Sequence, residues 1–333
     1  MRTRTVGTHD DVDTREDADT HDDAVANDHQ ERMQQTVFRI QMTGKRLSRI
    51  LTSFWLHLNN RSGQPGQVPL RRPLRTAYAG RMSSTVDSPD DAARRPLIAL
   101  LSGAGISTDS GIPDYRGPNG VWRRDPEAEK LVTYDHYMTD PEIRRRSWLM
   151  RRDGPALKAR PNAAHEAVAR LARSGAPVRV ITQNVDGLHQ LAGMPDRKVL
   201  ELHGTARTAL CTQCDARTPM TDALARVTAG EPDPKCLDCG GIMKSATVMF
   251  GEHLDPEVLG AAVTVAKSCD VFVAVGTSLS VQPAASLAGL AAEHGARLII
   301  VNAEPTPYDA LADEIVRDPI GEALPRLLAD LHP

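Results

Sequence analysis

Four short apolar runs, alternating with stretches that favour helices, constrain the fold of this 333-residue chain more than any other feature. They occupy residues 97–101, 178–182, 271–275 and 297–301, and a shorter run occupies 199–202. Helix-favouring stretches occupy residues 163–173, 257–267, 284–294 and 321–331. Strands that alternate with helices typically form a parallel sheet with helices on both faces. We therefore predict an α/β, Rossmann-like, doubly wound fold.

The first 95 residues differ in charge from the rest of the chain, although the net charge of the whole is only −3. Residues 1–31 carry ten Asp and Glu and three Arg, whereas residues 32–95 carry twelve Lys and Arg and three Asp. The acidic tail has too few apolar side chains to offset the entropy of ordering, so we expect it to be disordered. The basic stretch indicates either an amphipathic helix over 32–58 or a loose extension, followed by a linker. Met82 offers an internal start of translation.

The globular part is predicted to form one domain over residues 96–333. Its larger portion covers 96–206 and 245–333, residues 207–244 form a small insertion that carries four cysteines, and residues 113–160 form a loop followed by short helices. No run of eighteen apolar residues is present, so we expect no membrane span. The acidic N-terminus is unlike a secretory signal, and the cysteine usage favours a reducing compartment. We therefore expect a cytoplasmic protein.

Small polar residues follow three of the apolar runs, at the point where each predicted strand ends. They are Thr182-Gln183-Asn184 with Asp186, then Gly276-Thr277-Ser278, and Asn302 with Glu304. Ligands of open parallel sheets bind at this edge, where such groups suit ribose hydroxyls and a carboxamide. The alternative is that Asn184 or Asp186 merely caps the next helix. After the run at 97–101, Gly103-Ala104-Gly105-Ile106-Ser107 would let the backbone approach a pyrophosphate.

Two further short motifs have both a functional and a structural interpretation. His203 and Gly204 follow the run at 199–202, and local strand order would place this histidine beside Asn184. A lone histidine is more often structural than catalytic, but Gly204 could leave the ring open to a ligand. Val248-Met249-Phe250-Gly251-Glu252 is either a strand that ends in a turn or an exposed edge that pairs with an extended peptide.

Four of the five cysteines form two C-x-x-C pairs. Cys211 pairs with Cys214 and Cys236 with Cys239, and 21 residues separate the pairs. Two such knuckles suit one tetrahedral structural zinc ion, and four thiolates leave no open position for catalysis. A redox disulfide and a nucleic-acid-binding ribbon are the competing interpretations. Cys269 lies beside a buried run and is predicted to be a core residue.

Taken together, these segments resemble the sirtuin family of NAD-dependent protein lysine deacylases over about residues 96–330. The matching elements are GAGIS (103–107), DSGIPDYRG (109–117), TQNVDGLH (182–189), HG (203–204), the four cysteines, FGE (250–252), GTSL (276–279) and VNAE (301–304). They occur in the order found in the family. Each element alone is unspecific, but the whole series does not arise by chance.

The resemblance implies that NAD binds between a Rossmann-like part and a small zinc-bearing part. Gly103, Ala104, Gly105 and Ser107 would hold the pyrophosphate. Gln183, Asn184 and Asp186 would contact the nicotinamide end, with Ile112 and Asp114 nearby. A phosphate and the adenosine ribose would be held by Gly276, Thr277, Ser278, Asn302 and Glu304. Ile320 would lie near the adenine. Tyr115, where the family usually has Phe, and Arg116 belong to the mobile cofactor loop. The structural zinc would be bound by Cys211, Cys214, Cys236 and Cys239.

The implied reaction is an acyl transfer and not a redox step. The carbonyl oxygen of the acyl-lysine attacks C1′ of the nicotinamide ribose, and nicotinamide leaves. His203 then acts as general base on the ribose hydroxyls, which attack the resulting alkylamidate, with Asn184 as the second catalytic residue. Water finally gives free lysine and O-acyl-ADP-ribose. The near-neutral pKa of histidine suits this role. Acylated protein lysines would bind as an extended strand along residues 248–252.

The acyl preference and the rival functions depend on finer features. GPNGVW (117–122) is similar to class IV of the family, whereas other motifs are similar to other classes, so the subclass stays open. The Tyr-x-x-Arg pair of members that prefer succinyl or malonyl groups falls on Trp148 and Arg151, which favours a neutral acyl group such as acetyl. Two other functions remain: mono-ADP-ribosyl transfer in the same pocket, and a zinc-ribbon module that binds nucleic acid. The cysteine segment has few basic residues, so a nucleic-acid partner is not expected. The oligomeric state stays open.

Overall fold

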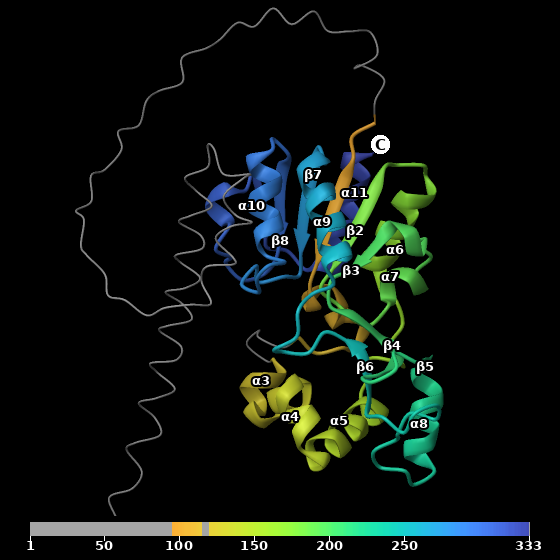
Figure 1. Cartoon of the computed structure of the whole chain (residues 1–333). Helices are drawn as coiled ribbons and strands as arrows, with labels where there is room; N and C mark the ends of the chain where they lie inside the picture. Colours follow the sequence, from red (N-terminus) through yellow and green to blue (C-terminus); the bar gives the residue numbers. More distant parts are fainter. Residues whose placement is uncertain (1–94, 115–119, 333) are drawn as a thin grey trace, which may run out of the picture. The chain divides into compact units, whose positions relative to one another are not determined.

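The computed structural model describes residues 95–114 and 120–332 (Figure 1). The predicted acidic tail, the basic stretch up to residue 94 with Met82, and the loop residues Tyr115 and Arg116 lie outside the described residues. Within the described part, none of the helices combines the length and the apolar character that a membrane span requires.

A six-stranded parallel sheet forms the centre of the larger part of the fold. Its strands, in spatial order, are β3 (Val199–Glu201), β2 (Val178–Thr182), β1 (Ile98–Ser102), β7 (Val271–Val275), β8 (Arg297–Val301) and β9 (Glu314–Val316). All of the pairings in this sheet are parallel. β1 and β7 are buried along their whole length, as expected for a parallel sheet with both faces covered. The predicted doubly wound α/β fold is confirmed.

Helices cover both faces of this sheet (Figure 1). The first face is covered by α6 (Ala163–Arg173) and α11 (Ile320–Leu331), and the second by α9 (Pro256–Ser268) and α10 (Ser286–Glu293). Side chains of a strand alternate between its faces, so Val273 packs in the first core whereas the adjacent Phe272 packs in the second. The apolar runs are continuous in the sequence because both faces of each central strand are buried.

A smaller antiparallel sheet carries the cysteines. Its order is β5 (Arg217–Pro219), β4 (Gly204–Cys211) and β6 (Met243–Thr247), and it is accompanied by α8 (Met220–Thr228) and by α3 (Val121–Arg124), α4 (Tyr134–Thr139) and α5 (Pro141–Asp153). Trp148 of α5 is 1% exposed and packs in one cluster with Met220 and Met243. The side chain at the position that the resemblance links to acyl selection is therefore a core residue of this small unit.

The structure adds strands that the sequence patterns do not predict. β9 has three residues, and its central Ile315 is 41% exposed, so no apolar run identifies it. The small sheet begins at Gly204 and ends at Thr247, so the cysteine segment predicted at 207–244 starts and ends within its strands β4 and β6. Most residues of β4 are only half-buried, which leaves no strong alternation of apolar and polar residues.

Candidate functional site

The polar segments that follow the strands converge at the carboxyl edge of the large sheet. Ser102, Thr182 and Val275 are register partners at the ends of β1, β2 and β7, and Val275 in turn pairs with Val301 of β8. The next peptide groups continue this pairing, because Gln183 N donates to Ser102 O and Gly103 N donates to Val275 O. The predicted shared edge is therefore present.

The glycine-rich turn packs directly on the turn after β7. Gly105 N donates to Gly276 O at 2.9 Å, and a Cβ atom on Gly103 would lie 2.7 Å from the same oxygen. Gly276 has φ of 59° and its own Cβ would lie 2.3 Å from Ile106 N. Glycine is therefore required here for contact between two backbones, before any ligand is considered. A short 3₁₀ helix, η2 (Ala104–Ser110), follows the turn.

Asn184, Ser107 and Asp186 form one buried hydrogen-bond network. The Asn184 amide donates to Gly103 O at 3.0 Å and to Ser107 Oγ at 3.2 Å, and Ser107 Oγ donates to Asp186 Oδ2 at 2.8 Å. Asp186 Oδ1 also accepts the N–H of Leu188 at 2.9 Å, at the start of α7 (Leu188–Leu191). Asp186 therefore belongs to the polar cluster and also holds the first N–H of α7, whose N-cap is Gly187 without a side-chain cap. Nearby, Gln183 Nε2 donates to Thr277 Oγ1 at 2.9 Å.

His203 lies beside this network. Its Nδ1 is 2.8 Å from Gln183 O, and a carbonyl can only accept, so Nδ1 carries the proton and Nε2 is the basic nitrogen. Burial lowers the pKa of His203 below its ordinary value of 6.5, against the opposing effect of this hydrogen bond. Gly204 has φ of 69°, and a Cβ there would lie 2.2 Å from Ala246 O. The backbone of β6 therefore requires this glycine, independently of any ligand that approaches the ring.

The remaining predicted contacts lie at or next to this edge. Asn302 Nδ2 donates to Glu304 O at 2.8 Å in the turn after β8. Ile320 begins α11, and its side chain packs against the first core cluster. Ile112 and Ser278 are half-buried, and the backbone carbonyl of Asp114 accepts from Val121 N at 3.0 Å.

A pair of buried histidines, which the sequence did not predict as part of the site, is connected to the Asn184 network through Ser102 and Thr182. His189 Nε2 is 2.9 Å from Ser102 Oγ, which donates to Thr182 Oγ1 at 2.8 Å, and Thr182 Oγ1 accepts the N–H of Asn184. The His189 and His165 rings meet edge to face, with centroids 5.0 Å apart. Burial lowers the pKa of His165 to about 4 and that of His189 to about 3.

These two pKa values predict that the fold loses stability in mild acid. The unfolded chain takes up a proton on each histidine below pH 6.5, whereas the folded chain does not, so stability is complete above pH 6.5 and falls as the pH decreases towards 4. The slope is about 1.4 kcal/mol per pH unit for each histidine. Glu201, whose pKa is raised by burial, opposes the effect and reduces the net slope. Urea unfolding of the wild type and of His189→Gln at several pH values measures how the free energy of unfolding changes with pH. Equal slopes in the two proteins would contradict the lowered pKa of His189.

Residues 248–252 form a turn whose amide donors are used within the chain. Val248 N donates to His203 O, Phe250 N donates to Val132 O, and Met249 N donates to the Glu252 carboxylate. These three N–H groups are therefore occupied within the chain, and the pairing of this segment with an extended peptide stays a prediction. The segment nevertheless adjoins an open cavity of about 500 Å³, which is lined by Gly204, Val248 and Glu252. A second cavity, of about 330 Å³, adjoins the edge strand β3 and is lined in part by Glu201.

An ion pair between the buried Lys244 and the partly exposed Glu252 fixes this turn to the small sheet. Lys244 Nζ lies 2.9 Å from Glu252 Oε2 and also donates to Thr247 O at 2.7 Å, and the lysine side chain is 6% exposed. Burial lowers the pKa of Lys244, while Glu252 opposes the shift. An ammonium group at this depth depends on its counter-ion.

We expect Glu252→Gln to destabilise the protein by about 3 kcal/mol, because it leaves Lys244 charged and uncompensated in a buried position. Glu257→Gln is a matched control, since Glu257 is exposed at the start of α9. Its effect should stay within about 0.5 kcal/mol. Denaturant unfolding compares the two variants, and equal midpoints would show that the pair does not fix the turn.

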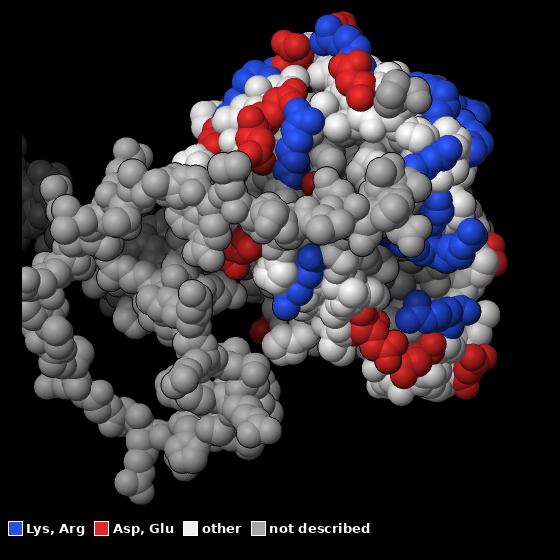
Figure 2. All heavy atoms as spheres, turned by 90° about the horizontal axis from the view of Figure 1, so that it is seen from above, with Lys and Arg blue, Asp and Glu red and all other residues white. Residues whose placement is uncertain are grey.

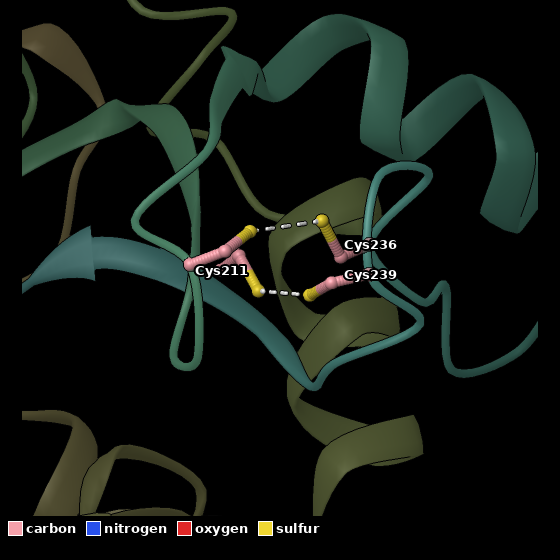
Figure 3. Close-up of side chains that lie close together, drawn as sticks. Cys211, Cys236 and Cys239 are labelled. Carbon is pink, nitrogen blue, oxygen red and sulfur yellow. Dashed lines mark hydrogen bonds between the residues drawn. The ribbon is translucent and has the colours of Figure 1, made fainter.

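The four cysteine sulfur atoms converge at the tip of the small sheet (Figure 3). All four lie within 4.8 Å of one another, with Cys211 Sγ 3.5 Å from Cys239 Sγ and Cys214 Sγ 3.7 Å from Cys236 Sγ. A disulfide requires about 2.05 Å, whereas sulfur atoms about 2.3 Å from a central zinc ion lie about 3.8 Å apart in a tetrahedron. The N–H of Gln213 donates to Cys211 Sγ and lowers the pKa of this thiol to about 7. The donor set fits a structural zinc ion, whereas Cys269 is a buried core residue.

The fold and the site define a class of protein. It is an α/β protein whose doubly wound sheet gathers polar groups at one edge and carries a four-cysteine module. The sequence model described as "Sir2 family" matches residues 103–283. The chain belongs to that family.

Relatives and solved structures agree with this assignment. The chain is 74% identical over 237 residues to "NAD-dependent protein deacetylase 2" of Streptomyces coelicolor, covering 71% of this chain and 98% of that protein. It is 42% identical over 230 residues to "NAD-dependent protein deacetylase" of Thermodesulfovibrio yellowstonii, covering 68% and 88%. A structure described as "Structural Basis for the Mechanism and Regulation of Sir2 Enzymes" aligns with TM-score 0.63 and 40% identity, covering 71% and 92%. Another, "Sir2-p53 peptide-NAD+", aligns with TM-score 0.62 and 34% identity, covering 70% and 92%.

Proposed function

We propose that the chain is an NAD-dependent protein lysine deacetylase, which transfers the acyl group to ADP-ribose and releases nicotinamide and O-acyl-ADP-ribose. The observation that carries this proposal is the placement of Asn184, Asp186 and His203 together at the carboxyl ends of β2 and β3. Membership of the Sir2 family and a relative of 74% identity that is named a deacetylase support it. Solved relatives described with p53 peptide and NAD support a protein substrate.

In this proposal NAD binds along the polar edge of the large sheet. The glycine turn and Ser107, at the start of η2, are assigned to the pyrophosphate. Gln183, Asn184 and Asp186 contact the nicotinamide end, with Ile112 and Asp114 beside it. The adenosine end takes Gly276, Thr277, Ser278, Asn302 and Glu304, with Ile320 near the adenine. Tyr115 and Arg116, outside the described residues, would complete the site.

His203 is proposed as the general base. Because burial lowers its pKa, the ring is neutral at pH 7, and the bond from Nδ1 to Gln183 O leaves Nε2 as the proton acceptor. NAD supplies the reactive ribose carbon, so the protein needs to orient the reactants and to accept one proton. The Asn184 side chain would hold the ribose through the network that already fixes its amide to Gly103 O.

The acyl-lysine peptide is proposed to lie as an extended strand along residues 248–252. The used N–H groups of Val248, Met249 and Phe250 hold the turn rigid, so a peptide would pair through the other backbone groups of the segment. We further propose that acetyl is preferred to succinyl. Trp148 supports this, since its ring is buried in the small core and the Tyr that pairs with Arg in succinyl-preferring members is missing.

Zinc is proposed as a structural ion that orders the small sheet and takes no part in the reaction. Cys211, Cys214, Cys236 and Cys239 would hold it as thiolates, which favours a reducing, cytoplasmic location. We propose that residues 96–333 form the catalytic domain and that the cysteine segment is an insertion in it.

One experiment separates the acyl and functional alternatives. Acetylated, succinylated and unmodified versions of one peptide are incubated with NAD, using the full chain and the chain from Met82. Deacetylation of the acetylated peptide with little turnover of the succinylated one supports the proposal. Mono-ADP-ribosyl transfer predicts instead that labelled ADP-ribose becomes attached to protein without any acyl group. A nucleic-acid module predicts no turnover and binding that weakens steeply with salt.

A further inference from the structure

We propose that Arg317 is a positioning residue for the adenosine end of NAD, because its guanidinium holds the turn that carries Asn302 and Glu304. This inference rests on the proposed function, which assigns those two residues to the adenosine ribose. Arg317 itself follows β9 and belongs to none of the motifs that identify the family in this sequence.

The guanidinium joins three parts of the chain. Arg317 Nη1 donates to Asn302 O at 2.7 Å and to Glu304 O at 2.9 Å, and Nη2 pairs with the carboxylate of Asp309. Asp309 is fixed in turn, because its Oδ1 accepts from Thr306 Oγ1 at 2.7 Å. The charged group therefore bridges both ends of the loop that leaves the sheet after β8.

The same contacts determine where the Asn302 side chain lies. Asn302 is held on both sides by residues at the end of β9. Its N–H donates to Val316 O, and its carbonyl oxygen accepts from Arg317. The Asn302 amide donates to Glu304 O, which also accepts from Arg317. Because one carbonyl receives both donors, loss of the guanidinium would loosen the backbone and the amide together.

Exposure and topology determine which kinetic constant should change. The side chains of Arg317 and Asp309 are 34% and 24% exposed, so the pair is partly shielded from water and charge-assisted bonds keep much of their strength. β9 and β3 are the opposite edges of the six-stranded sheet, and His203 follows β3. Arg317 should therefore affect binding of the adenosine end and leave the chemistry at the ribose of nicotinamide unchanged.

The test is Arg317→Gln, with Arg317→Lys as the conservative variant. We expect the KM for NAD and the Kd for ADP-ribose to rise about tenfold, which is about 1.4 kcal/mol. We expect kcat at saturating NAD to stay within about twofold, and inhibition by nicotinamide to be unchanged. Lysine keeps the charge but not the forked geometry, so it should restore only part of the affinity.

Arg297→Gln is the matched control. Arg297 pairs with Glu314 at 2.6 Å, so it also joins β8 to β9, but at their amino ends. Figure 2 looks onto that amino-end face, where basic and acidic side chains both occur. This variant removes an inter-strand ion pair and should leave the Kd for ADP-ribose unchanged.

Four outcomes would overturn the proposal. Unchanged Kd in Arg317→Gln shows that the turn needs no guanidinium. An equal loss of affinity in Arg297→Gln assigns Arg317 a purely structural role. The same holds if Arg317→Gln lowers kcat together with the melting temperature of the protein. A wild-type chain that neither binds ADP-ribose nor turns over acetylated peptide refutes the proposed function and, with it, the role of Arg317.

Discussion

His203→Ala is expected to lower kcat for deacetylation by about 10²- to 10⁴-fold, the usual contribution of a positioned general base. The ring is held by one hydrogen bond to Gln183 O, and in the proposed mechanism its nitrogen Nε2 accepts the proton. Removing it should leave the fold intact, because His203 is only partly buried and lies outside the buried hydrophobic clusters. Steady-state turnover of an acetylated peptide measures the loss, and circular dichroism checks the fold.

Two further readouts make this prediction specific. In the proposed mechanism His203 is needed only after nicotinamide has left, so exchange of labelled nicotinamide into NAD should survive in the variant. Because burial keeps the pKa of His203 below 6.5, the acid limb of kcat/KM in the wild type should have its midpoint below pH 6.5. His294→Ala is the control, since His294 is exposed at the end of α10. Retention of most of the deacetylation in His203→Ala would assign the base elsewhere.

Cys211→Ser is expected to release zinc and to unfold the small sheet. Structural zinc contributes about 10–16 kcal/mol of apparent binding free energy, whereas a whole domain is stable by only about 5–15 kcal/mol. The small core has few members, and Cys211 and Cys236 are themselves among them, so packing alone cannot replace the ion. We expect metal content to fall from one ion per chain towards zero, and thermal unfolding to begin at a lower temperature.

Cys269→Ala is the matched control, because Cys269 is buried among α9 and β7 residues, away from the four-cysteine cluster. It should lose some stability through the missing contacts but keep its zinc. Chelation of the wild type should reproduce the effect of Cys211→Ser. A metal-free chain that keeps its fold and its turnover would refute the structural role of the ion.

The large sheet could be predicted because its central strands are buried on both faces and therefore stand out as apolar runs. The runs at 178–182, 271–275 and 297–301 coincide with β2, β7 and β8. β9 and the strands beside the cysteines could not be predicted, since short, half-exposed strands take their stability from their neighbours and carry little local pattern. The cysteine spacing indicated a metal site but not the antiparallel sheet that surrounds it.

The polar edge of the site was predictable because parallel strands deliver their carboxyl ends to one side. The supporting residues were not, because each acts through a contact distant in sequence. His189 reaches Ser102, Lys244 reaches the turn at Glu252, and Arg317 reaches the turn after β8. For Gly103 and Gly204 the residue was identified but the reason was not: a neighbouring backbone, and not a ligand, occupies the place of the missing side chain.

The most direct test of the proposed function counts products. Acetylated peptide and NAD are incubated with the full chain. The amounts of nicotinamide, deacetylated peptide and O-acetyl-ADP-ribose are measured by mass spectrometry. The proposed function predicts equal amounts of all three, and negligible nicotinamide when the peptide carries no acetyl group. Nicotinamide released in step with ADP-ribose attached to protein, without loss of acetyl groups, would contradict it.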